Sequence, residues 1–158
     1  LIETLYAASA AGTRIDLIVR GLSCLRAGVA GMSENIRVRS ILGRYLEHSR
    51  IYRFGHGNVV HGERLADATS DAVYLIGSAD PMPRNLNRRV EVMVPIQHAR
   101  HTASLDQALE FALADDVVRW ELQPDDTWTR MGATNSFQPH SQERIYRWTV
   151  EQQLAGRT

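Results

Sequence analysis

Residues 33–50, SENIRVRSILGRYLEHSR, are the stretch from which the fold of this chain can be read. The stretch ends in His48-Ser49-Arg50, and Arg50 begins a predicted strand, Arg50-Ile51-Tyr52-Arg53-Phe54. Residues i and i+2 of a strand point the same way. His48 and Arg50 can therefore face one pocket if the extended geometry reaches back to His48.

A second stretch, IGSADPMPRNLNRRVE at residues 76–91, supplies further candidate site residues. The apolar run 72–76 predicts a buried strand, and Gly77-Ser78-Ala79-Asp80 follows at its carboxyl end, where open α/β sheets collect ligands. Gly77 and Ser78 have little or no side chain and would leave space for a ligand. The Ser78 hydroxyl can donate a hydrogen bond to an oxyanion. We expect this turn to be part of a binding site.

Arg20 occupies a comparable position near the start of the chain. The β-branched run Ile15–Val19 predicts another buried strand, and Arg20 and Gly21 come directly after it. From the local sequence alone, Arg20 is equally well read as a phosphate ligand or as a surface arginine at a loop entry.

The remaining elements follow from periodicity and turn residues. We expect helices at 2–11, 42–47, 103–114 and 141–153, further strands at 36–41, 88–94, 118–122 and 127–130, and loops at 22–33 and 55–71. Trp120 and Trp128 could pair across the last two strands. The histidine pairs His56/His61 and His98/His101 fall in expected loops without enough further ligands for a metal site.

Composition describes an ordinary globular domain with an uneven charge. The chain has 158 residues, 44% of them hydrophobic, and its one cysteine, Cys24, excludes an internal disulfide. All 18 basic residues are arginine, and the segment from Arg14 to Arg53 holds eight of them against three acids, a net charge of +5. Because a guanidinium pairs bidentately with phosphate oxygens, this segment suits a polyanion.

Two of these arginines alternate along one expected strand. In Ile36-Arg37-Val38-Arg39-Ser40-Ile41, Arg37 and Arg39 share a face. Such a pair is either exposed to solvent or, in a phosphate channel, part of the wall.

The two stretches resemble the second half of the phospholipase-D type of phosphoryl-transfer site. There a His-x-Lys is followed by a Gly-Ser-x-Asn strand end, then a basic residue and an acid. In this chain Arg50 stands where lysine is usual and Asp80 where asparagine is usual, while Arg84 and Glu91 supply the basic residue and the acid.

A closer resemblance covers roughly Leu5 to Val94. The chain is similar to the C-terminal catalytic domain of polyphosphate kinases in these segments: Ile15-Asp16-Leu17-Ile18-Val19-Arg20-Gly21, Ser33 to Ile41, Arg44 to Arg50, Gly77 to Asp80 and Arg84-Asn85-Leu86. Trp120-Glu121-Leu122 with Trp128-Thr129 resembles actinobacterial members. Pro81 departs from the aromatic residue usual there.

This resemblance implies a mixed β-sheet flanked by helices, of the phospholipase-D-like α/β class, and reversible transfer of the ATP terminal phosphate to polyphosphate. It makes His48 the catalytic histidine that faces the phosphorylated one and acts as acid and base, and it makes Arg20 a phosphate clamp. The phosphorylated histidine and the Mg²⁺ ligands are expected on an upstream domain. The wider superfamily adds further phosphate-binding candidates, namely Arg50, Ser78, Asp80 and Arg84.

Glu91 has two possible roles. Its carboxylate could orient the His48 imidazole, or it could form an ion pair with Arg84 or Arg89.

Two other functions remain open. The chain could be a phospholipase-D-type phosphodiesterase or nuclease half that acts as a homodimer, or a non-catalytic module that binds polyanions. Nucleic acid is not the expected partner, since no series of aromatic residues interleaves the arginines.

We expect one domain over residues 1–158, with a core at about 1–115 and a C-terminal appendage at about 116–158. Leu1 directly precedes an expected helix and is not an initiator methionine, so we expect the chain to be part of a longer protein that forms a homo-oligomer and is inactive without its other domains. The expected location is cytoplasmic, with peripheral association at the inner face of the membrane as an alternative.

Overall fold

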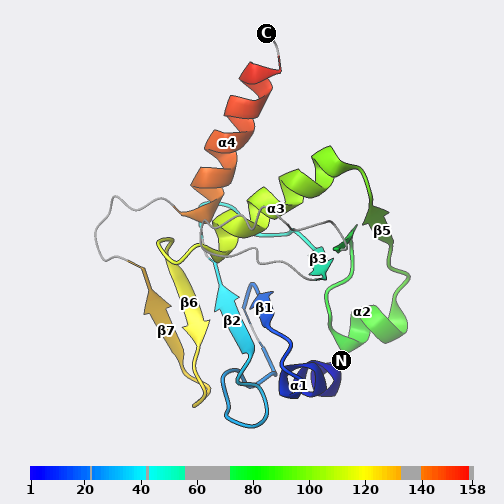
Figure 1. Cartoon of the computed structure of the whole chain (residues 1–158), viewed down its shortest axis with the longest axis vertical. Helices are drawn as coiled ribbons and strands as arrows, with labels where there is room; N and C mark the ends of the chain where they lie inside the picture. Colours follow the sequence, from blue (N-terminus) through cyan, green and yellow to red (C-terminus); the bar gives the residue numbers. More distant parts are fainter. Residues whose placement is uncertain (22, 42, 56–71, 133–139, 157–158) are drawn as a thin grey trace. The chain divides into compact units, whose positions relative to one another are not determined.

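The computed structural model describes residues 1–21, 23–41, 43–55, 72–132 and 140–156. The expected loop histidines His56 and His61 lie outside them. Helices and strands mix along the chain (Figure 1). The elements are α1 Ile2–Ala10, β1 Ile15–Ile18, β2 Ile36–Ser40, β3 Ile51–Phe54, β4 Val73–Gly77, α2 Pro83–Arg88, β5 Met93–Ile96, α3 Ala99–Leu113, β6 Arg119–Leu122, β7 Trp128–Met131 and α4 Ser141–Ala155.

Two compact units make up the chain, the first from residues 1–47 and 114–158 and the second from residues 48–113. The first holds a four-stranded mixed sheet in the order β1-β2-β6-β7. Strand β1 pairs with β2 in parallel, and the β2–β6 and β6–β7 pairs are antiparallel. The α/β class is therefore confirmed, with the described strands in two sheets. Strands β6 and β7, expected in an appendage, belong to the same sheet as β1.

The core of the first unit lies between α1 and this sheet. Leu25, Ala27, Ile36 and Val38 are buried and form its centre. Helix α1 packs against them through Leu5 and Tyr6, and Leu122 and Trp128 of β6 and β7 also take part. The alternation of β2 sends Ile36 and Val38 to this face.

Both arginines of β2 form ion pairs with acids of the first unit. Arg39 is fully buried, with its side chain only 1% exposed, and pairs with Asp115 at 2.7 Å and Glu121 at 3.0 Å. Arg37 pairs with Asp16 of β1 at 2.9 Å. The acids that neutralise Arg39 come from the second half of the chain, which local sequence patterns cannot reveal.

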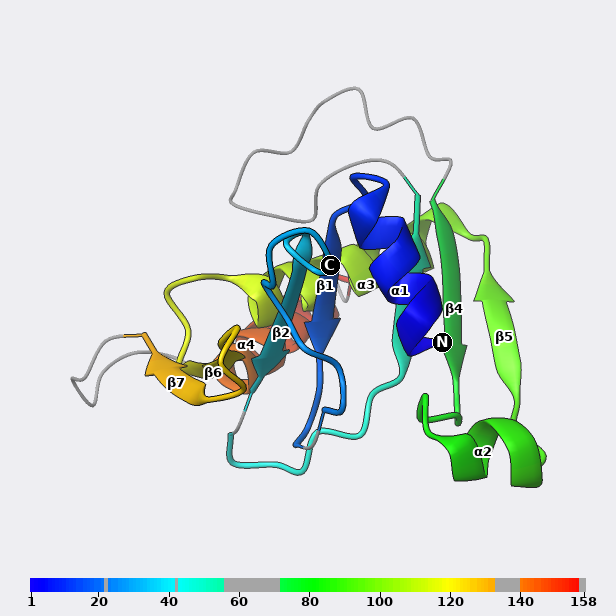
Figure 2. The ribbon, with the colours of Figure 1, turned by 90° about the horizontal axis from the view of Figure 1, so that it is seen from below.

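The second unit contains an antiparallel sheet in the order β3-β4-β5. Figure 2 shows β5 beside β4, with α2 at the end where the chain passes between them. Asp106 of α3 fastens that helix to the sheet, since it accepts a hydrogen bond from the Tyr74 hydroxyl at 2.7 Å and from Arg53 Nε at 3.1 Å. Burial, followed by this hydrogen bond, raises the pKa of Tyr74.

The prediction of a helical turn at residues 42–47 is wrong for residues 43–47, the part that the structure describes. Residues 43–47 form bends and an irregular connection. Tyr45 N–H donates to Gln142 Oε1 at 2.9 Å, and Gln142 Nε2 donates to the Tyr45 carbonyl at 2.7 Å. A side chain 97 residues away thus satisfies the backbone groups that a helix would have used.

The prediction of a strand at residues 88–94 is also wrong. Residues 83–88 form α2, and β5 begins only at Met93, so Glu91 precedes the strand. Pro83 opens the helix, where its fixed φ is favourable and its missing N–H costs nothing.

Two smaller expectations need correction. His101 lies inside α3, which begins at Ala99, four residues earlier than expected. Trp128 pairs with Leu122, and Trp120 pairs with Arg130, so the two tryptophans are not directly opposite each other. In the described ranges no helix is long and apolar enough to cross a membrane.

Candidate active site

Arg50 joins the two stretches that the sequence singled out. Its Nε and Nη2 donate to the two carboxylate oxygens of Asp80, each at 3.1 Å. Its Nη1 donates to the His48 carbonyl at 2.5 Å and lies 2.5 Å from His48 Nδ1. The side chain is only 12% exposed. Arg50 therefore braces His48 against Asp80.

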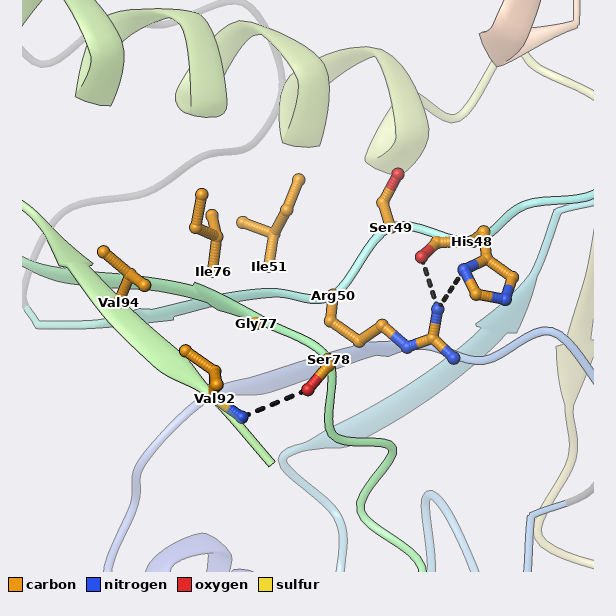
Figure 3. Close-up of a pocket in the computed structure, with 9 residues that line it drawn as sticks. All are labelled: His48, Ser49, Arg50, Ile51, Ile76, Gly77, Ser78, Val92 and Val94. Atoms are coloured by element: carbon orange, nitrogen blue, oxygen red, sulfur yellow. Dashed lines mark hydrogen bonds between the residues drawn. The ribbon is translucent and has the colours of Figure 1, made fainter. Parts of the chain in front are cut away.

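A pocket of about 500 Å³ is lined in part by His48 and Arg50. Figure 3 shows its lining, polar at one end and apolar along the sheet. The polar side chains are His48, Ser49, Arg50 and Ser78, and the apolar ones are Ile51, Ile76, Val92 and Val94, with Gly77 between the two groups. His48 and Arg50 therefore line one pocket, although β3 begins only at Ile51 and both residues precede it.

Ser78 is held by the segment that leads into β5. Its hydroxyl donates to Glu91 Oε2 at 2.5 Å and accepts from Val92 N–H at 3.1 Å. Its own N–H donates to the Val92 carbonyl at 3.0 Å. The hydroxyl proton that was expected to serve an oxyanion is thus engaged by Glu91.

Glu91 has hydrogen-bond partners other than those expected. It accepts from Ser78 and, at 2.8 Å, from the buried Asn85 side chain, which sequence reasoning gave no role. The Ser78 hydroxyl, and less strongly the Asn85 amide, lower the pKa of Glu91. Neither an ion pair with arginine nor a bond to His48 is among these contacts, so an orienting role toward His48 stays a prediction.

Tyr52 is a further member of the site that the sequence did not single out. Its hydroxyl donates to the Ala79 carbonyl at 2.7 Å and so holds the backbone next to Asp80. Burial, and next the Asp80 carboxylate, raise the pKa of Tyr52, which keeps the phenol protonated as a donor. The signal was present in the sequence, since Tyr52 stands two residues beyond Arg50 on the same strand face.

Family comparison places this geometry in context. Residues 1–142 match the model of the family described as polyphosphate kinase C-terminal domain 2. The chain belongs to this family.

Individual polyphosphate kinases support this assignment. The polyphosphate kinase of Synechocystis is 48% identical over 146 residues, and that of Mycobacterium tuberculosis H37Ra is 51% identical over 129 residues. These matches cover 92% and 82% of this chain, but only 18% and 16% of the relatives. The crystal structure of the Porphyromonas gingivalis polyphosphate kinase superimposes with a TM-score of 0.82 at 32% identity, over 98% of this chain and 22% of that one. The phospholipase-D-like fold is thus shown.

Within this polyphosphate kinase domain, Arg20 lies just beyond β1, in the first unit. It is exposed, and its Nη1 donates to the Glu47 carbonyl at 3.0 Å. Arg84 lies exposed in the first turn of α2 and is not among the residues that line the pocket. Phosphate binding by either residue stays a prediction.

The described residues contain no group of three or more His, Cys, Asp or Glu side chains that could hold a metal ion.

Gly77 packs closely against the neighbouring segment and also lines the pocket. A Cβ at this position would collide with the Val92 carbonyl oxygen and the Met93 side chain of the neighbouring segment. The backbone oxygen cannot move aside without breaking the Ser78–Val92 hydrogen bond.

We expect Gly77→Ala to lower the free energy of unfolding by about 1–3 kcal/mol, the usual cost of overpacking. Urea unfolding followed by circular dichroism measures this loss. Gly21→Ala is the matched control, because a Cβ on Gly21 meets no atom within 4 Å. Equal stability of the two variants would contradict the packing role of Gly77.

Proposed function

We propose that this chain supplies part of the active site for reversible transfer of the terminal phosphate of ATP to inorganic polyphosphate. The chain is a polyphosphate kinase C-terminal domain, and the observation that carries the proposal is the bracing of His48 by Arg50 at the polar end of an open pocket. Phosphoryl transfer depends mainly on positioned groups that stabilise transition-state charge, and a fixed imidazole beside a cavity can be such a group.

Each residue then has a defined part in the reaction. His48 contacts the phosphoryl group in transfer, and Arg20 holds a phosphate of ATP through its remaining guanidinium N–H groups. The phosphorylated histidine and any magnesium ligands lie outside this chain, as the family resemblance implies. We therefore expect the chain alone to catalyse no transfer. A homo-oligomer in the cytoplasm is part of the same proposal.

A chimera tests this proposal directly. Residues 1–142 would replace the matching segment of the Synechocystis polyphosphate kinase, to which the chain is 48% identical. We expect the chimera to form polyphosphate from ATP, and the isolated chain to form none. An inactive but folded chimera would contradict the proposal. Release of nitrophenol from bis-nitrophenyl phosphate by the isolated chain would favour a phosphodiesterase instead.

In this chimera we expect Arg20→Ala to raise the KM for ATP about 10- to 100-fold, because a charge-assisted hydrogen bond contributes about 1.5–3 kcal/mol. Steady-state kinetics at varied ATP measures the change. The matched control is Arg130→Ala, an exposed arginine on β7 of the same unit, for which the KM is expected to stay unchanged. An unchanged KM in Arg20→Ala would remove Arg20 from the proposed site.

A further inference from the structure

We infer that His48 acts as a neutral hydrogen-bond donor through Nε2, and that Arg50 and Asp80 are positioning residues that hold it in this form. The inference rests on the proposed function for its substrate, a phosphoryl group in transfer. It differs from the acid–base role that the family resemblance implied, because it requires no proton to leave the ring.

The contact between Arg50 and the imidazole decides the tautomer. A guanidinium has only N–H donors and cannot accept a hydrogen bond. Arg50 Nη1 lies 2.5 Å from His48 Nδ1, so Nδ1 must be the acceptor. A neutral ring whose Nδ1 accepts carries its proton on Nε2. A doubly protonated ring would set two N–H donors and two positive charges against each other.

Asp80 fixes the direction from which Arg50 approaches the ring. It takes both Nε and Nη2 of the guanidinium at 3.1 Å and leaves Nη1 for His48. The Tyr52 hydroxyl in turn donates to the Ala79 carbonyl at 2.7 Å and so holds the backbone next to Asp80. A lysine could not reproduce this arrangement, because one ammonium lacks the planar fork that matches a carboxylate.

Nε2 is then the ring atom available to a substrate. It lies on the other side of the ring from the Nδ1 edge that contacts Arg50 (Figure 3). To donate its proton outright, the neutral ring would have to take up another at Nδ1, which Arg50 occupies. A hydrogen bond from Nε2–H to a phosphoryl oxygen needs no such exchange, and neutral imidazole is known to serve as an electrophile in this way.

Nuclear magnetic resonance of the chain with ¹⁵N-labelled histidine tests the tautomer. The chain has six histidines, and loss of one ring signal in His48→Gln assigns His48. We expect long-range ¹H–¹⁵N couplings to show the Nε2–H tautomer for His48 in the native chain. Arg50→Met and Asp80→Asn are expected to shift the ring toward a mixture of tautomers. A native ring protonated at Nδ1, or a tautomer unchanged in Arg50→Met, overturns the inference.

The kinetic test uses His48→Gln in the chimera. A glutamine amide offers an N–H donor near the place of Nε2 but cannot act as an acid or a base. We expect its turnover to stay within about tenfold of native, well above that of His48→Ala, since one positioned donor accounts for about 10²–10³ in rate. Equal loss in the two variants, with both folded, overturns the inference. An inactive native chimera with an Nε2–H ring instead overturns the proposed function and leaves the tautomer standing.

Discussion

Replacing His48 with alanine in the chimera is expected to lower turnover by about 10²–10³, the loss seen when one positioned donor to transition-state charge is removed. The KM for ATP is expected to change little, because His48 stabilises charge that develops during transfer. His48 is exposed and lies at the polar end of the pocket, so its truncation removes little packing. Rates of polyphosphate formation at saturating ATP measure the effect.

His101→Ala is the matched control for this variant. His101 is also an exposed histidine of the second unit, but it lies in α3 and does not line the pocket. We expect the turnover of this control to equal that of the native chimera. If His48→Ala retained native turnover while its thermal unfolding was unchanged, His48 would have no part in the chemistry.

Strands with a strong apolar pattern could be predicted from the sequence. The β-branched run after residue 14 became β1, and the alternation of Ile36 and Val38 became the core face of β2. Both patterns report burial of the strand itself, which depends on local spacing. The residues on which the motifs converged, His48, Arg50 and Asp80, do lie together.

Their roles could not be predicted, because a role depends on the partner. Arg50 and Asp80 were both expected to bind phosphate, which stays a prediction, and the structure shows that they also form a bidentate pair with each other. Ser78 was expected to donate to a ligand, and it donates to Glu91. A motif names the residue types that gather at a site, but it does not say which of them neutralise one another.

The prediction of a helical turn just before His48 was wrong for a similar reason. Leu42 to Glu47 has the spacing of a helical turn, but Gln142 supplies the hydrogen bonds of Tyr45 from the far end of the chain. Helices this short gain little from propensity alone. A single tertiary contact can therefore replace them.

Arg39→Ala is expected to lower the free energy of unfolding by about 2–5 kcal/mol, the usual cost of truncating a long buried side chain. Arg39 is 1% exposed and bridges Asp115 and Glu121, which come from the segment after α3 and from β6. Without it, Asp115 and Glu121 still contact Arg119, and the core gains a cavity. Urea unfolding of the chain measures the loss.

Arg37→Ala is the matched control, since it removes the same side chain from the same strand. Arg37 is 39% exposed, and its ion pair with Asp16 is therefore expected to contribute about 0–1 kcal/mol. A large difference between the two variants would mean that Arg39 serves the fold and is not available to a polyanion. Equal, small losses would contradict this conclusion. Arg39 would then again be a candidate for binding a polyanion, as the net charge of +5 suggested.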